Sequence, residues 1–233
     1  MTTWLEGTPS EYVQARGERR WVTGGDKPVV GLDIDGTLGD YHSHFLWFAE
    51  QWLGVHMPSA SEINPGMPLH KFMGVEHHIY RECKLAYRQG GLKRFMPCYE
   101  YAAELTANVR ATRAQLWICT TRPYLRLDNI DPDTREWLRR NRIEYDAVIF
   151  EGVDGKSKYA DLVEQVGVHR ISSVTDDLPE QTADAVAQGI STVYLRDQPY
   201  NRVQAVTGKR VKSLRELWGQ ISEDLEVWRE FND

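Results

Sequence analysis

Two aspartates follow a short apolar run near the start of the chain, in the stretch VVGLDIDGT at residues 29–37. The run VVGL has the composition of a strand that is buried on both faces, so Asp33 and Asp35 are expected at its tip. Gly36 breaks the regular backbone just after them. Two carboxylates held this close together repel each other unless a cation or a shared proton offsets their charge. The stretch therefore predicts a metal site.

Polar side chains also follow two later apolar runs. AQLWICT ends in Thr120, which is followed by Thr121, and RISSVTDD ends in Asp176 and Asp177. Parallel strands place their carboxyl ends on one edge of a sheet, so we expect all these side chains at the same edge. If the first strand and the strand that ends in the two acids are neighbours, four carboxylates converge there. Such a cluster favours Mg²⁺, a hard cation that prefers oxygen ligands.

The same edge has groups suited to a phosphate. Thr120 could donate a hydrogen bond to a phosphate oxygen, and Lys156 or Lys158 could neutralise its charge. Together with clustered carboxylates and a divalent cation, these groups indicate phosphoryl transfer through a carboxylate nucleophile. Two other interpretations fit less well, because DIDGTLGDYHSH lacks the glycine and glutamate of an EF-hand loop and GVDGKSK lacks the first glycine of a P-loop.

Most of the chain alternates between apolar runs typical of strands and stretches with helical spacing. We expect strands at residues 29–32, 114–120, 146–150, 170–177 and 191–195, the last of these being the final strand. Helices are expected at residues 99–110, 131–141, 156–167, 178–189 and 213–231. Strands that alternate with helices of this length predict an α/β fold, with a Rossmann-like parallel sheet flanked by helices.

Three parts of the chain differ in their patterning. Residues 1–28 are polar and precede the first strand, so we expect an N-terminal appendage. Residues 41–95 begin with aromatic and aliphatic side chains at three- and four-residue spacing and continue with several Pro and Gly residues but no strand pattern. They predict a small helical cap, inserted after the first strand between the two pieces of the core, residues 29–40 and 96–233.

Composition narrows the class of protein. The 233 residues carry a net charge of −6, which argues against a general nucleic-acid binder and against a stable nucleic-acid partner. No apolar run approaches the roughly 20 residues that span a bilayer, and the first residues lack the pattern of a signal peptide, so we expect a cytoplasmic protein with no membrane partner. The three cysteines have no spacing typical of a disulfide framework or a zinc site.

In residues 29–197, four motifs appear in the order DIDGT, ICT, a lysine before a helix, and TDD. With these motifs the sequence resembles the haloacid dehalogenase-like (HAD) phosphatase superfamily. The resemblance implies that Asp33 is the nucleophile that becomes an aspartyl-phosphate and that Asp35 is the general acid and base. It also implies that Mg²⁺ is held by Asp33, the backbone carbonyl of Asp35, and one or both of Asp176 and Asp177. Lys158 suits the family spacing slightly better than Lys156.

Within the superfamily, DIDGTLGDY, a helical cap and ICTTRP resemble the 5′-deoxyribonucleotidase branch most closely. That resemblance implies a small phosphorylated substrate, a nucleoside monophosphate, with Tyr41 stacked on the base and Arg122 as a further contact. The sequence departs from the branch in having Thr121 and Arg122 after Thr120. It also lacks the short spacing between lysine and acid that is typical of the branch, because Lys158 and Asp176 are 18 positions apart.

Two alternatives remain. TTRP followed by DPDTREWLRRNRIEYDAVIF is similar to the phosphatase half of polynucleotide kinase/phosphatases, which implies hydrolysis of a polynucleotide 3′-phosphate. The acidic net charge and a cap that would obstruct a polymer end argue against this substrate. An inactive member of the fold could serve as a binding module, but the retained acids of DIDGT and TDD argue against that function.

Overall fold

The computed structural model describes residues 27–123, 127–151, 156–202 and 207–232. The expected N-terminal appendage, apart from its last two residues, lies outside the described part of the chain. No helix within that part is both long enough and apolar enough to cross a membrane.

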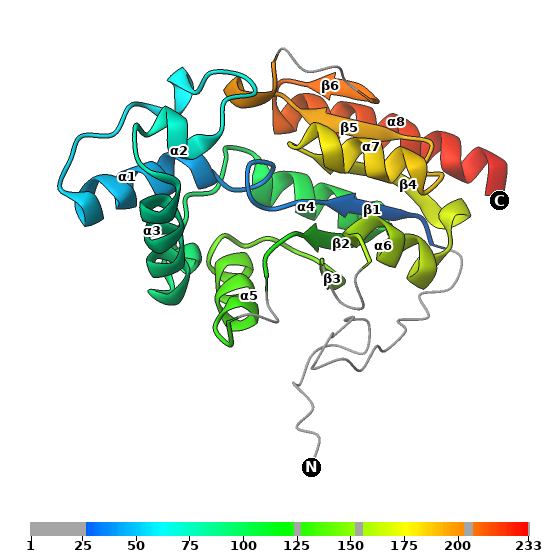
Figure 1. Ribbon diagram of the computed structural model, residues 1–233. Helices are drawn as coiled ribbons and strands as arrows, with labels where there is room; N and C mark the ends of the chain where they lie inside the picture. Colours follow the sequence, from blue (N-terminus) through cyan, green and yellow to red (C-terminus); the bar gives the residue numbers. More distant parts are fainter. Residues whose placement is uncertain (1–26, 124–126, 152–155, 203–206, 233) are drawn as a thin grey trace.

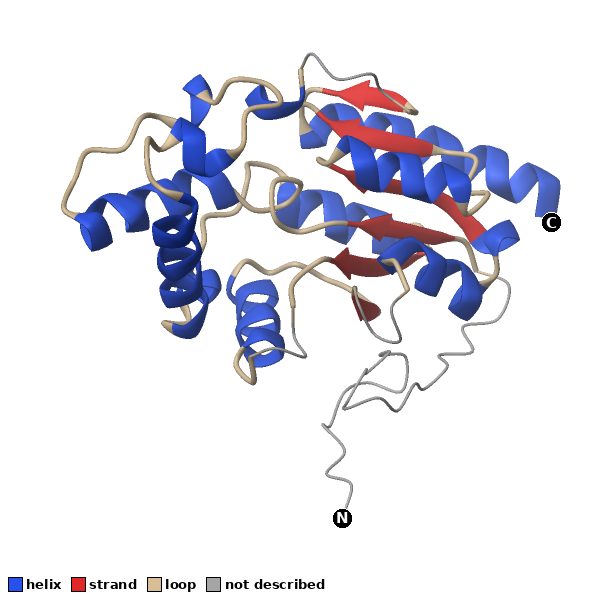
Figure 2. Cartoon of the chain, viewed as in Figure 1, coloured by secondary structure: helices blue, strands red, loops and turns tan. Residues whose placement is uncertain are grey.

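A single parallel sheet of six strands forms the centre of the described structure, as Figures 1 and 2 show. Its strand order is β3-β2-β1-β4-β5-β6. The strands are β1 (Val29–Leu32), β2 (Gln115–Thr120), β3 (Ala147–Phe150), β4 (Ile171–Asp176), β5 (Val193–Arg196) and β6 (Lys209–Val211). The expected α/β fold with a parallel sheet is confirmed. Because β1 lies between β2 and β4, the strand order reverses beside it, where ligands bind in open α/β sheets.

Helices cover both faces of this sheet. On one face lie α4 (Ala102–Ala111), α5 (Ile130–Arg140) and α8 (Leu214–Asn232), and on the other lie α6 (Lys158–Val166) and α7 (Pro179–Ala187). Side chains alternate along each strand, so Leu116 and Ile118 of β2 enter the first layer, while Trp117 and Cys119 enter the second. All four are buried, which explains why these strands are apolar runs without polar alternation.

The sequence prediction misses β6. We expected the strand at residues 191–195 to be the last one, yet Lys209–Val211 adds a further parallel strand beside β5. This edge strand has three residues, two of them basic, and only Val211 is buried. So short a segment has no recognisable hydrophobic period, and its pairing depends on the neighbouring strand.

Residues 41–95, called the insert below, contain helices and no strands. They carry α1 (Tyr41–Leu53), η1 (Ala60–Glu62), α2 (Leu69–Phe72), α3 (His77–Gln89) and η2 (Leu92–Phe95). Asp40 caps α1 by accepting a hydrogen bond from the amide of Ser43 at 3.2 Å. Phe45 and Tyr87 pack edge to face between α1 and α3. The insert lies beyond the carboxyl ends of β1 and β2, where the arrowheads point (Figures 1 and 2).

Candidate active site

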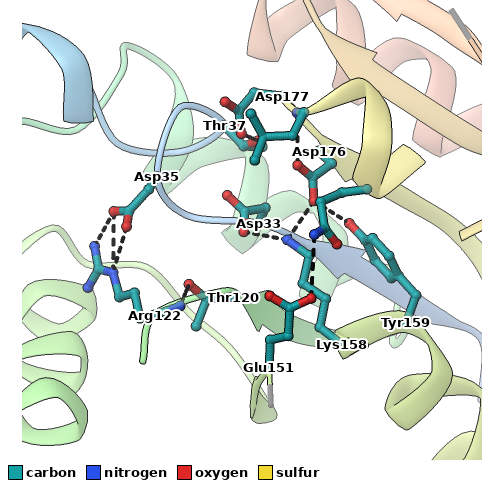
Figure 3. A network of polar contacts seen from close by, with 12 residues as sticks. Asp33, Asp35, Thr37, Thr120, Arg122, Glu151, Lys158, Tyr159, Asp176 and Asp177 are labelled. Carbon is teal, nitrogen blue, oxygen red and sulfur yellow. Dashed lines mark hydrogen bonds and ion pairs between the residues drawn. The ribbon is translucent and has the colours of Figure 1, made fainter. Parts of the chain in front are cut away.

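A tight turn after β1 sends Asp33 and Asp35 in different directions (Figure 3). The amide of Asp33 still pairs with β4, through the carbonyl of Thr175 at 3.0 Å. The carbonyl of Ile34 then accepts hydrogen bonds from three following amides. Gly36 has a φ of 97°, and a Cβ atom there would lie 2.3 Å from a carboxylate oxygen of Asp177. Glycine therefore lets the turn approach the acids at the end of β4.

Three buried carboxylates meet at the ends of β1 and β4. Asp33, Asp176 and Asp177 are 3%, 1% and 1% exposed, and each contributes an oxygen within 4.8 Å of the others. β1 and β4 are neighbours, which was the condition for the acids to converge, and their pairing brings together three of the four expected carboxylates. Oxygen ligands at this spacing suit a hard divalent cation.

Lys158 lies between two of the acids. It is fully buried at the start of α6, which Ser157 caps by accepting a hydrogen bond from Ala160. Its Nζ donates to Asp33 Oδ1 at 2.7 Å and lies 2.5 Å from Asp176 Oδ2. Lys156 instead pairs with Glu164 at the surface. Of the two lysines that the sequence left open, the structure brings Lys158 to the cluster.

The cluster holds three acids and one basic group. Burial raises the pKa of Asp33 to about 7, with Lys158 opposing the shift and Asp176 adding to it. Burial and the two neighbouring acids also hold the pKa of Asp177 well above its usual range. The pKa of Lys158 is raised, because Asp176 and Asp33 outweigh the effect of its burial. Three carboxylates beside one ammonium group fit a site that binds a further cation.

Two tyrosines that the sequence analysis did not select orient the acids at the end of β4. The Tyr159 hydroxyl donates to Asp176 Oδ2 at 2.8 Å, and the Tyr200 hydroxyl donates to Asp177 Oδ2 at 2.5 Å. Tyr159 directly follows Lys158, whereas Tyr200 belongs to η6 (Pro199–Asn201) after β5. No motif marks either residue, since each reaches the site through the fold of the core.

Asp35 lies outside the carboxylate cluster. The Arg122 guanidinium binds its carboxylate in a bidentate manner, with Nη2 2.6 Å from Oδ1 and Nε 3.2 Å from Oδ2. Lys93 of the insert contacts the same carboxylate. Burial alone would raise the pKa of Asp35, but the positive charges of Arg122 and Lys93 hold it below its usual range. The side chain is thus an ionised carboxylate. Its predicted part in metal binding depends on the backbone carbonyl alone.

The remaining predicted site residues differ in their surroundings. Thr120 ends β2, is 1% exposed, and accepts a hydrogen bond from the amide of Arg122 through its hydroxyl at 3.4 Å. Thr121 is half-buried, and the described residues show no hydrogen bond of its side chain. Tyr41 is 9% exposed, and its ring stacks on Phe45 at 5.7 Å between centroids.

The Tyr41 ring is already in contact with protein groups. Lys93 Nζ lies 4.8 Å from its centroid, and Tyr87 and His42 meet it edge to face. This packing argues against the stacking of a substrate base on the ring. Sequence patterning could not reveal this, because Tyr41 closely follows the turn that carries Asp33 and Asp35 but its ring packs within the insert.

The fold matches solved structures of the HAD superfamily. A HAD-superfamily hydrolase of subfamily IA from Geobacter sulfurreducens is 18% identical, with a TM-score of 0.56 over 85% of this chain and 98% of that chain. A HAD family hydrolase from Deinococcus radiodurans with bound phosphate and sodium is 16% identical, with a TM-score of 0.60 over 85% and 96%. A predicted phosphatase from Clostridium acetobutylicum is 13% identical, with a TM-score of 0.60 over 84% and 99%.

No family model matches the sequence, and no curated protein sequence matches it either. The structural neighbours cover most of this chain and nearly all of their own length. Because the sequence identities are 13–18%, these neighbours support a conclusion about the fold alone. The chain has the fold of the HAD-superfamily hydrolases.

Proposed function

We propose that the protein is a Mg²⁺-dependent phosphomonoester hydrolase that acts through an aspartyl-phosphate on Asp33. One observation carries this proposal: Asp33 lies at the carboxyl edge of the sheet, bonded to the buried Lys158 and within 4.8 Å of two further buried acids. Its HAD-like fold is shared with hydrolases, one of them solved with bound phosphate. A carboxylate can attack the phosphorus of an anionic ester only if positive charge offsets the repulsion between the two. Lys158 and a Mg²⁺ ion bound by the acids would supply that positive charge.

In the first step a carboxylate oxygen of Asp33 forms a bond to phosphorus, and the bond from phosphorus to the leaving oxygen breaks. Lys158 holds Asp33 in place for this attack, and Thr120 donates a hydrogen bond to a phosphate oxygen. Mg²⁺, held by Asp33, the Asp35 carbonyl and one or both of Asp176 and Asp177, would offset the negative charge of the ester when bound.

In the second step a water oxygen forms a bond to phosphorus while Asp35 accepts a proton of that water, and the bond from phosphorus to the Asp33 oxygen breaks, which releases inorganic phosphate and restores the Asp33 carboxylate. The ionised state of Asp35 suits this second role. To protonate the leaving oxygen in the first step, Asp35 must gain a proton, which Arg122 and Lys93 oppose as long as both remain on its carboxylate. We infer that an arriving substrate phosphate draws at least one of these cations away from Asp35.

The proposed substrate is a nucleoside monophosphate or a similarly small phosphate ester, on which the insert closes. The insert supplies Lys93 next to Asp35, so it takes part in the site and does more than cover it. A screen of nucleoside monophosphates, sugar phosphates and 3′-phosphorylated oligonucleotides tests this assignment. A preference for oligonucleotides would favour the 3′-phosphatase alternative, and no turnover of any ester would favour an inactive binding module.

Removal of metal tests the proposed chemistry. After dialysis against EDTA, hydrolysis of a chromogenic aryl phosphate is expected to fall to about a hundredth or less, because a phosphate dianion must approach three carboxylates that, within the described part of the chain, share the single ammonium group of Lys158. Added Mg²⁺ should restore the rate. Full turnover in metal-free buffer would contradict the proposal.

A further inference from the structure

A groove of about 470 Å³ lies between α3 and the residues Pro123 and Leu127, which come after β2 in the sequence. We call it the α3 groove, and its walls include Arg81, Glu82, Lys84, Arg88, Pro123 and Leu127. Three of these side chains are basic and one is acidic. Neither the carboxylate cluster nor Asp35 lies in its walls, so the steps proposed above leave the groove without a role.

The basic side chains share one face of α3. Arg81, Lys84 and Arg88 are three and four residues apart, the spacing that aligns side chains along a helix. Lys84 donates to the Tyr80 hydroxyl at 3.2 Å. Among the described residues, neither Arg81 nor Arg88 has an ion-pair partner, and the Nε of Arg88 is buried without a hydrogen-bond partner. In a protein of net charge −6, this is a concentration of positive charge, with Glu82 as the acidic residue among the described walls of the groove.

The inner end of the groove adjoins the reaction site. Pro123 directly follows Arg122, which binds Asp35. Helix α3, which ends just after Arg88, packs against η2, and η2 carries the Lys93 that contacts Asp35. The side chain of Asn129 donates to the Arg88 carbonyl at 2.7 Å and fixes the end of α3 to the core.

From Arg88 the groove extends outward along α3 to Arg81. Seven residues of helix correspond to about 10 Å, at 1.5 Å of rise per residue. An anionic group in the groove would therefore lie apart from the phosphate that Asp33 attacks, but within reach of the same molecule. Arginine binds phosphate oxygens through two parallel N–H groups, and an unpaired guanidinium is available for this geometry.

We propose that the α3 groove binds a second phosphate group of the substrate, so that the preferred ester is one end of a molecule with at least two phosphates. A nucleoside bisphosphate and the 3′-phosphorylated end of an oligonucleotide both have this chemistry. The inference rests on the proposed phosphatase activity, but it replaces the nucleoside monophosphate proposed above with an ester that carries a second phosphate. It also gives the insert a part in selecting the substrate.

The test compares kcat/KM for three substrates: an aryl phosphate, a nucleoside 3′,5′-bisphosphate and a short 3′-phosphorylated oligonucleotide. In the Arg81→Gln/Lys84→Gln double variant, we expect the ratio of kcat/KM for a two-phosphate substrate to that for the aryl phosphate to fall about tenfold. Lys71→Gln is the matched control, because Lys71 is an exposed basic residue of the insert outside the groove walls. It should leave the ratio unchanged.

Two further readouts complete the design. Glu82→Gln removes the acid from the groove walls and should raise the same ratio. If the natural ligand is an oligonucleotide, its binding should weaken with salt, and each lost phosphate contact should lower the log–log slope by about 0.7. A substrate ratio that falls only for the bisphosphate would identify the smaller ligand.

The outcomes separate the two proposals. An unchanged ratio in the double variant, with normal turnover of the aryl phosphate, would overturn the groove assignment and leave the phosphatase proposal standing. An equal fall in the double variant and in Lys71→Gln would also overturn it, because total charge would then explain the effect. Absence of turnover on all three substrates would overturn both proposals.

Discussion

Asp33→Asn is expected to abolish hydrolysis of every phosphate ester, by about 10⁴-fold or more, because an amide cannot attack phosphorus as a carboxylate can. The side chain keeps its shape, and Lys158 can still donate to its oxygen, as it does to Asp33 at 2.7 Å. Initial rates at saturating Mg²⁺ measure the effect. Saturation excludes weakened metal binding as the explanation.

The Asp33→Asn protein should remain folded. The substitution removes one negative charge from a buried cluster of three carboxylates and one lysine, so we expect stability to be unchanged or slightly higher in metal-free buffer. Urea unfolding followed by circular dichroism provides this control. Turnover of the variant near the wild-type rate, with the fold intact, would show that another residue is the nucleophile.

Lys158→Met should have the second large effect, on stability as well as activity. The fully buried ammonium is within 2.7 Å of Asp33 and 2.5 Å of Asp176. Breaking a buried ion pair by removing one partner typically costs about 3–5 kcal/mol, because the remaining charge is left uncompensated. The free energy of unfolding in metal-free buffer should fall by about this amount, and phosphatase activity should fall with it.

Lys156→Met is the matched control for this experiment. Lys156 is two residues away in sequence, but it pairs with Glu164 at the surface, with both side chains about two-fifths exposed. Exposed ion pairs contribute about 0–1 kcal/mol, so this variant should keep its stability and its activity. Equal effects of the two substitutions would contradict the assignment of Lys158 to the site.

The sequence predicted the sheet and the acids because both depend on local patterns. Apolar runs that alternate with helical spacing indicate buried parallel strands, and Asp33, Asp176 and Asp177 follow two of these runs directly. The choice between Lys156 and Lys158 needed the structure. Ser157 is the N-cap of α6, so Lys158 is the first residue of the helix and is buried, whereas Lys156 precedes the helix and lies at the surface.

The partners of Asp35 could not be predicted, because they depend on the folded insert. Lys93 is 58 residues away in sequence from Asp35, and nothing in the stretch LKRF distinguishes it from a solvated lysine. Arg122 is predicted to contact the substrate, and in the structure its guanidinium binds Asp35. Tyr41 was expected to stack on a base, and its ring is buried against Phe45 instead. The contacts of Asp35 with Lys93 and Arg122 arise from packing between distant segments, whereas Phe45 lies four residues from Tyr41 on α1.

Trapping of the covalent intermediate tests the central claim most directly. The protein is mixed with an aryl phosphate at saturating Mg²⁺, and the reaction is quenched in acid. The protein is then digested, and the peptide that contains Asp33 is analysed by mass spectrometry. The experiment is repeated with Asp35→Asn, which cannot accept a proton from water and should slow hydrolysis of the intermediate by about 10²- to 10⁴-fold. An aryl leaving group needs little protonation, so the intermediate still forms.

We predict that the Asp33 peptide gains the mass of one phosphoryl group and that its occupancy is higher in Asp35→Asn than in the wild type. Asp33→Asn should show no such gain. Turnover of the aryl phosphate with no phosphoryl group on Asp33 in either protein, or with the group on a different residue, would contradict the proposed mechanism.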